Sequence, residues 1–181
     1  EWELEWRRAL TGKRSAKAAG RLGSLMLGFL IGGTEYPGRE THLQQVFNYV
    51  KRSGRVRWDG ASLRNVCLFL DAMARERRHR GATALLKTRL AQGLKKFPEI
   101  PDFPFLAGRQ EMDKGPMMCD RRLARRYFEQ ARDLAAKSGP KYTALKEQAE
   151  RQLTFLAEVG ECSFGPSMLG GGGPFDDGDD D

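Results

Sequence analysis

Histidine and cysteine are scarce in this chain. Its 181 residues include two histidines, His42 and His79, and three cysteines, Cys67, Cys119 and Cys162. An odd number of well-separated cysteines does not form a disulfide framework, and no CxxC or Cys/His spacing indicates zinc. We therefore expect no metal or other cofactor, and we expect an intracellular, reducing compartment.

Long apolar segments are also missing. The most apolar stretch, LGSLMLGFLI at residues 22–31, is about half as long as the ~20 residues that cross a bilayer. We interpret it as a buried helix, so a membrane is an unlikely partner, although residues 13–31 leave peripheral association as a third alternative. The chain begins at Glu1 without Met. A fragment of a longer protein fits this start, and so does import into a mitochondrion or plastid with removal of a transit peptide.

Motifs for catalysis and nucleotide binding are absent as well. Neither histidine has a Ser, Cys or carboxylate at a suggestive spacing, and there is no GxxxxGK[ST] or GxGxxG motif at a strand–helix junction. The four glycines at 170–173 lack a following lysine and helix, so we interpret them as a linker. We expect no enzymatic activity and assign no catalytic residue.

Basic residues are what the chain has in excess. Lys and Arg number 31 against 24 Asp and Glu, a net charge of +7. Residues 161–181 contain six of the acids and no base, so residues 1–160 carry all 31 bases with the other 18 acids, a net charge of +13. We expect a basic helical domain over residues 1–160, which would attract polyanions. We expect residues 161–181 to form a Gly-rich, acidic, flexible tail, which would either solubilise the protein or compete for its basic surface.

Helical periodicity dominates the rest, and no set of alternating segments predicts a sheet. We expect an all-α protein, a compact bundle or short solenoid-like array of six to seven helices with a disordered acidic C-terminal tail. Helices are predicted over about 41–53, 62–78, 83–96, 120–137 and 141–159. Thr41 and Gln44 fit a capping box, and Asp120 fits an N-cap. The second of these helices is the expected centre of the core, through Leu63, Val66, Cys67, Leu70 and Met73.

Residues 49–56, YVKRSGRV, resemble the helix–turn of pentatricopeptide repeats, and successive helical hairpins resemble an α-solenoid. The resemblance covers eight residues, and the chain has no self-similar period of 34 or 35 residues. No site or activity is carried over from it.

The segment FPEIPDFPF, residues 97–105, has a proline at every third position, which predicts a polyproline II conformation. One interpretation is a strap across the core; the other is a peptide that docks on a partner. In the second, a partner-binding set would be Trp2, Trp6, Phe103 and Phe105. Residues 107–119 are expected to be irregular.

Two basic clusters are the positive functional signal. One lies on the helix predicted over 120–137, and the other covers residues 75–96. Guanidinium groups suit phosphate oxygens, although such faces can also be merely solvated or complement a helix dipole. The predicted nucleic-acid-binding residues are Arg75, Arg77, Arg78, Arg80, Lys87, Arg89, Lys95, Lys96, Arg121, Arg122, Arg125 and Arg126.

These clusters predict a non-catalytic nucleic-acid-associated protein, with RNA favoured over DNA, inside a larger ribonucleoprotein assembly. An organellar ribosome or expression machinery and a viral nucleocapsid both fit, and other protein subunits would then be partners. The alternative is a helical protein–protein adaptor or assembly factor with an acidic partner. Trp58 could stack on a base, but its large apolar area favours a role in anchoring its loop to the core.

Overall fold

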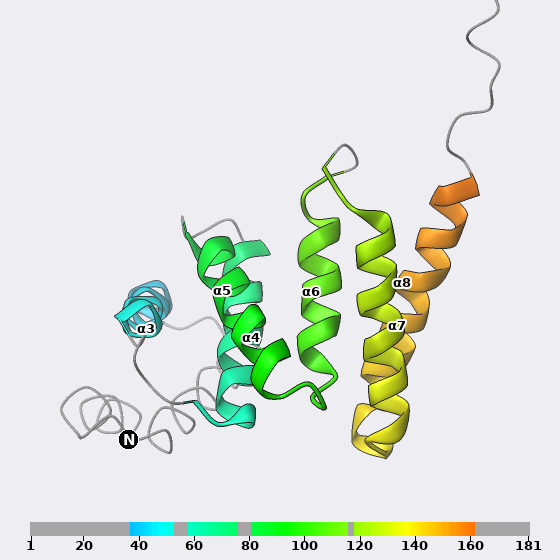
Figure 1. The fold of residues 1–181 in the computed structure, drawn as a ribbon. Coiled ribbons are helices and arrows are strands. Elements are labelled where there is room, and N and C mark those ends of the chain that lie inside the picture. The colour runs from blue at the N-terminus through cyan, green and yellow to red at the C-terminus, as the bar shows by residue number, and fades with distance from the viewer. Residues whose placement is uncertain (1–36, 53–57, 76–80, 116–117, 162–181) are drawn as a thin grey trace, which may run out of the picture.

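The computed structural model describes residues 37–52, 58–75, 81–115 and 118–161, and these form six α-helices without a strand. The all-α prediction is confirmed (Figure 1). The bounds of the helices, including one short 3₁₀ helix, are α3 (Arg39–Arg52), α4 (Gly60–Arg75), α5 (Ala82–Lys96), α6 (Asp102–Met112), α7 (Arg121–Lys137), η1 (Pro140–Tyr142) and α8 (Thr143–Glu161).

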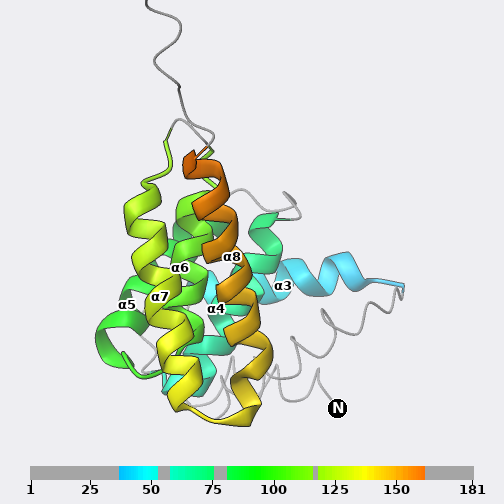
Figure 2. The ribbon, with the colours of Figure 1, turned by 90° about the vertical axis from the view of Figure 1, so that its right-hand side faces the viewer.

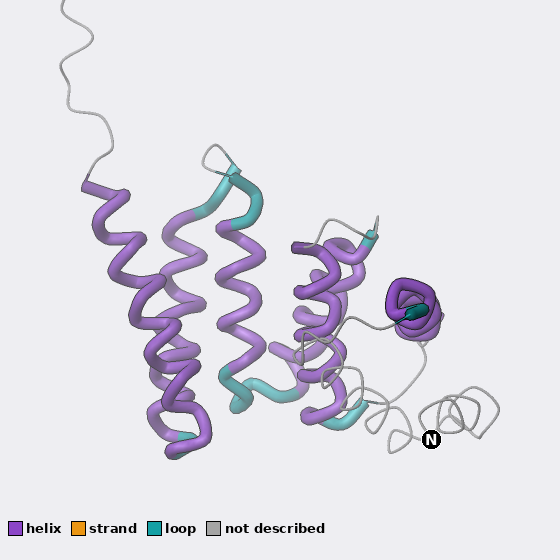
Figure 3. The backbone as a smooth tube through the Cα atoms, turned by 180° about the vertical axis from the view of Figure 1, so that it is seen from behind, coloured by secondary structure: helices purple, strands orange, loops and turns teal. Residues whose placement is uncertain are grey.

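The helices from α4 to α8 stand side by side, whereas α3 runs across their direction (Figures 1 and 2). From behind, the described chain is seen to consist of helices joined by short loops (Figure 3). The predicted acidic tail after α8 lies outside the described residues. So do Trp2 and Trp6 and residues 53–56, the second half of the segment that resembles a pentatricopeptide repeat.

α4 is the centre of the core, as the sequence predicts. Leu63, Val66, Cys67, Leu70 and Met73 are all buried, with exposed fractions of 0–1%. The apolar stripe of α3 is buried as well and consists of Leu43, Val46, Phe47 and Val50. The capping box is wrong, because α3 begins at Arg39, directly after a turn at Gly38 with φ of 86°, and Thr41 therefore lies inside the helix.

Two buried carboxylates join α4 to α6. Asp102, at the start of α6, lies 2.8 Å from Nε of Arg64 on α4. Asp71 on α4 lies 3.2 Å from Nη2 of Arg109 on α6 and 3.0 Å from Nη2 of Arg75. Each carboxylate thus keeps an ionic partner when it is taken out of water, and the two pairs fix how α6 lies on α4.

The predicted polyproline strap is wrong. The chain turns at Phe97–Pro101 and enters α6 at Asp102, so Pro104 lies in the first helical turn. A proline is tolerated there, because the first N–H groups of a helix have no intrahelical partner. The helix continues to Met112, so the prediction that residues 107–119 are irregular fails for its first half.

The Phe side chains of this segment are core residues. Phe103 is completely buried and stacks at 6.5 Å on Phe97, and Phe105 is 5% exposed and packs edge-on against Phe128. The prediction that Phe103 and Phe105 bind a partner is therefore wrong.

α7 and α8 form the predicted helical hairpin. Asp120 caps α7, because its Oδ1 accepts a 3.0 Å hydrogen bond from the Leu123 N–H. The buried face of α7 consists of Ala124, Phe128, Ala131 and Ala135. The helical spacing predicts five inward residues on this helix, of which Phe128 and Ala131 are buried, whereas Leu123, Tyr127 and Leu134 are only half-buried.

Candidate nucleic-acid interface

The outer face of α7 carries two arginines that point to solvent. Arg122 and Arg126 are exposed and lie one turn apart, on the side opposite the buried Ala124 and Phe128. Neither has an ion-pair partner among the described residues. The two acids of α7 are already engaged by other arginines: Glu129 lies 3.4 Å from Arg125, and Asp133 lies 2.8 Å from Arg132.

The other two predicted arginines of α7 differ from this pair. Arg125 is exposed, but Glu129 partly neutralises it, and Arg121 is half-buried. The four arginines therefore do not form one uniform row, and Arg122 and Arg126 are the two best placed for an external anion.

α5 contributes a second group of bases. Lys87, Lys95 and Lys96 are exposed, and the helix contains no acidic residue. Arg75, at the end of α4, is exposed and paired with Asp71. Arg77, Arg78 and Arg80 lie outside the described residues.

Arg89 does not belong to this surface, and its predicted role in phosphate binding is wrong. It is 4% exposed, and its guanidinium donates hydrogen bonds at 3.3 Å to the Val50 carbonyl of α3 and to the Gln92 side chain. It also lies 5.9 Å from the centre of the buried Trp58 ring. Burial lowers the pKa of the guanidinium. Arg89 thus ties α5 to the last turn of α3, and Trp58 anchors its loop in the core, where it cannot stack on a base.

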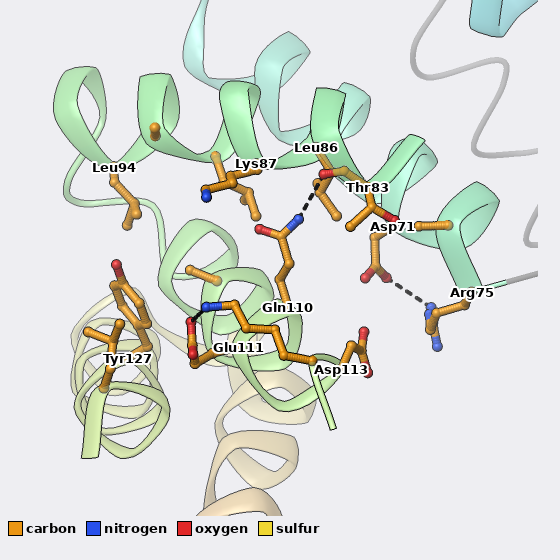
Figure 4. A pocket seen from close by; sticks show the side chains of 16 residues that line it. Asp71, Arg75, Thr83, Leu86, Lys87, Leu94, Gln110, Glu111, Asp113 and Tyr127 are labelled. Carbon is orange, nitrogen blue, oxygen red and sulfur yellow. Dashed lines mark hydrogen bonds and ion pairs between the residues drawn. The ribbon is translucent and has the colours of Figure 1, made fainter. Parts of the chain in front are cut away.

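A groove that the sequence did not predict lies between α5 and α7 (Figure 4), with a volume of about 740 Å³. α6 contributes Ala107, Gln110 and Glu111 to it. The walls are mainly apolar and include Leu86, Leu90, Ala91 and Leu94 from α5 and Leu123 and Tyr127 from α7. The side chain of Gln110 crosses the groove and donates a 3.0 Å hydrogen bond to the Thr83 carbonyl.

The buried carboxylates of the groove have partners. Glu111 accepts hydrogen bonds from Nζ of Lys114 and, at 3.0 Å, from the Asp120 N–H. Burial alone would raise the pKa of Glu111, but these hydrogen bonds outweigh it and the pKa is lowered. Burial raises the pKa of Asp71, against the opposing effect of Arg109 and Arg75.

No group of three or more His, Cys, Asp or Glu side chains within the described ranges could hold a metal ion. In that same part of the chain, no helix combines the length and the hydrophobicity that a membrane crossing requires. His79 lies outside it, and only the backbone of His42 is described.

No model of a known protein family matches this chain, and no match is found among curated proteins or solved structures. Function must therefore be argued from the surface and the groove themselves.

Proposed function

We propose that the protein binds nucleic acid without catalysis and acts as a component of a larger ribonucleoprotein assembly, with RNA favoured over DNA. The observation that carries the proposal is the pair Arg122 and Arg126, which is exposed on α7 and has no acidic partner in the described structure. A planar guanidinium can donate two parallel hydrogen bonds to a phosphate, and it stays charged at every physiological pH.

The proposed phosphate-binding surface is smaller than the sequence suggested. It comprises Arg122, Arg125 and Arg126 of α7 and Lys87, Lys95 and Lys96 of α5. Arg121 is half-buried and Arg75 is paired with Asp71, so both are less available to a phosphate. Arg77, Arg78 and Arg80 remain sequence predictions. An intracellular, reducing compartment, including the interior of an organelle, suits such a protein, because Cys67 and Cys119 are free thiols in the described part of the chain.

The proposal is tested by reversing the two exposed arginines, Arg122→Glu together with Arg126→Glu. Affinity for RNAs of unrelated sequence should fall. The slope of log affinity against log salt should flatten by ~0.7–0.9 per lost phosphate contact, because fewer counterions are released. Fluorescence anisotropy titrations at several salt concentrations measure both quantities, and circular dichroism checks that folding survives.

A matched control has the same change of net charge on another helix. Lys146→Glu together with Arg151→Glu reverses the half-buried Lys146, which lies 3.7 Å from Glu150, and the exposed Arg151 of α8, where Glu147, Glu150 and Glu158 already make the surface acidic. We expect this control to lose less affinity than the α7 variant. If the α7 variant keeps the affinity and the salt slope of the parent, the surface does not bind RNA. The alternative, an adaptor with an acidic protein partner, would then be favoured.

A further inference from the structure

We propose that the groove between α5 and α7 receives an unpaired base of a single-stranded nucleic acid. This inference rests on the proposed function, and it adds the kind of nucleic acid bound and the place of contact. Its first support is continuity. Leu123 and Tyr127 line the groove, and each directly follows one of the exposed arginines, Arg122 and Arg126. Successive helical residues lie about 100° apart, so the arginine face and the groove wall are adjacent sides of α7.

The second support is the aromatic ring at one end of the groove. Tyr127 is half-buried, and its hydroxyl points toward Leu94 across the groove (Figure 4). A base that enters beside this ring would be covered by apolar side chains of α5. Stacking on aromatic side chains is the common way in which proteins hold unpaired bases, because every base has a π-face.

The charged side chains around the groove suit a nucleic-acid strand whose nucleobase enters at the Tyr127 end. Lys87 lines the groove on α5, and Arg126 precedes Tyr127 on α7. Each wall therefore has a positively charged side chain for the phosphates that flank the bound nucleobase. Of the acids in the groove, Glu111 is bonded to Lys114, and Asp71 is paired with Arg75 and Arg109. The exposed Asp113 lies away from the Tyr127 end (Figure 4).

The amide oxygen of Gln110 provides a hydrogen-bond acceptor in a fixed position in the groove. Its amide nitrogen donates to the Thr83 carbonyl, so its oxygen is directed along the groove toward the side of Lys87 (Figure 4). This oxygen can accept a hydrogen bond from an amino group of a base. In a duplex the base is stacked between its neighbours and paired with the opposite strand, so it cannot enter the groove beside Tyr127. The groove therefore favours single strands, whereas the arginine face accepts any phosphate backbone.

The test compares a single-stranded RNA with a blunt duplex of the same length and uses two variants of the groove. Tyr127→Ala removes the ring, and Tyr127→Phe is its control, since it keeps the ring. Ala91→Trp fills the groove from the exposed rim without removing a core contact, and its control is Thr88→Trp, an exposed position of α5 outside the groove. Anisotropy titrations measure affinity, and thermal unfolding checks each fold.

Tyr127→Ala should weaken single-strand binding by about 5- to 150-fold, the cost of losing one stacked base, and should leave duplex binding unchanged. Ala91→Trp should act in the same direction, while Tyr127→Phe and Thr88→Trp should bind like the parent. If both groove variants bind single strands like the parent while the Arg122/Arg126 reversal still weakens both RNAs, the base-binding inference is wrong and the proposed function stands. The groove would then be open to another occupant, such as a helix of a protein partner. If the parent binds neither RNA, or if the arginine reversal has no effect, the proposed function fails and the inference fails with it.

Discussion

At Gly93, α5 packs closely against Phe103 of α6. A Cβ added there would lie 2.6 Å from two ring carbons of Phe103, far inside van der Waals contact. Phe103 is completely buried, so its ring has little room to move. At this position, therefore, the absence of a side chain matters more than the conformational freedom of glycine.

Gly93→Ala should destabilise the protein, although alanine normally favours a helix over glycine by about 0.5–1 kcal/mol. We expect a net loss of about 1–3 kcal/mol, the usual cost of overpacking a core. Urea unfolding measures it. The loss should shrink when the clash is relieved in a Phe103→Leu background. An equal loss in both backgrounds, or a gain in stability, would show that contact with Phe103 is not the cause.

Burial of single apolar residues was predictable, whereas burial of a charged one was not. Leu70, Cys67 and Phe128 are buried where the helical spacing put them. Arg89 was assigned to the surface by its charge, yet it falls on the same face as Leu86 and Leu90. Its spacing from those leucines was the sequence feature from which its burial could have been predicted. Its hydrogen-bond acceptor, the Val50 carbonyl, lies 39 residues away and could not be inferred from local sequence.

At the scale of elements, the sequence-based prediction failed mainly at α6. Three prolines at a spacing of three indicated an extended strap, but the last of them lies in the first turn of a helix. The ion pairs Arg64–Asp102 and Asp71–Arg109 hold that helix on α4. Because α6 was missed, Gln110 and Glu111 of the groove were missed with it. By contrast, the Asp120 cap and the α7–α8 hairpin depend on short-range signals and were predicted.

Glu111 joins the end of α6 to the start of α7, and its stabilising effect should depend on pH. Its hydrogen bonds from Lys114 and from the Asp120 N–H require the carboxylate, and they lower its pKa in the folded protein. An acid whose pKa is lower in the folded state stabilises the fold above its unfolded pKa. This contribution is lost as the pH falls through the folded value.

Glu111→Gln should therefore be less stable than the parent at about pH 7, and the difference should shrink as the pH falls through the lowered pKa of the parent's carboxylate. The free energy of unfolding in urea, measured for both proteins at each pH, checks this. Glu99→Gln, in the exposed loop before α6, controls for the loss of one negative charge. A difference between Glu111→Gln and the parent that stays constant with pH would mean that ionisation of Glu111 is not responsible.

At the scale of the whole molecule, the groove exists because residues of α4, α5, α6 and α7 meet around it. Its lining comes from residues as far apart in sequence as Asp71 and Tyr127, and the helical spacing of Leu86, Leu90 and Leu94 alone indicates ordinary core. The net charge can be counted from the sequence, but the sequence does not show which charged side chains are neutralised by their neighbours in the fold. Of the twelve predicted basic residues, Arg89 is buried and Arg77, Arg78 and Arg80 lie outside the described residues, and phosphate binding by the other eight stays a prediction.

Charge at this scale also leads to a prediction about the acidic C-terminal segment. Residues 170–181 include five aspartates, Asp176, Asp177, Asp179, Asp180 and Asp181, and no base. Negative charge tethered to a basic protein competes with an external polyanion for the same cations, and salt weakens both interactions. Deleting residues 170–181 should therefore raise RNA affinity, most strongly at low salt, and leave the unfolding midpoint nearly unchanged. Replacing the five aspartates with asparagine in the full-length chain separates charge from length and should give the same rise. RNA binding that weakens in both variants would contradict the competition and would indicate that these carboxylates support binding instead.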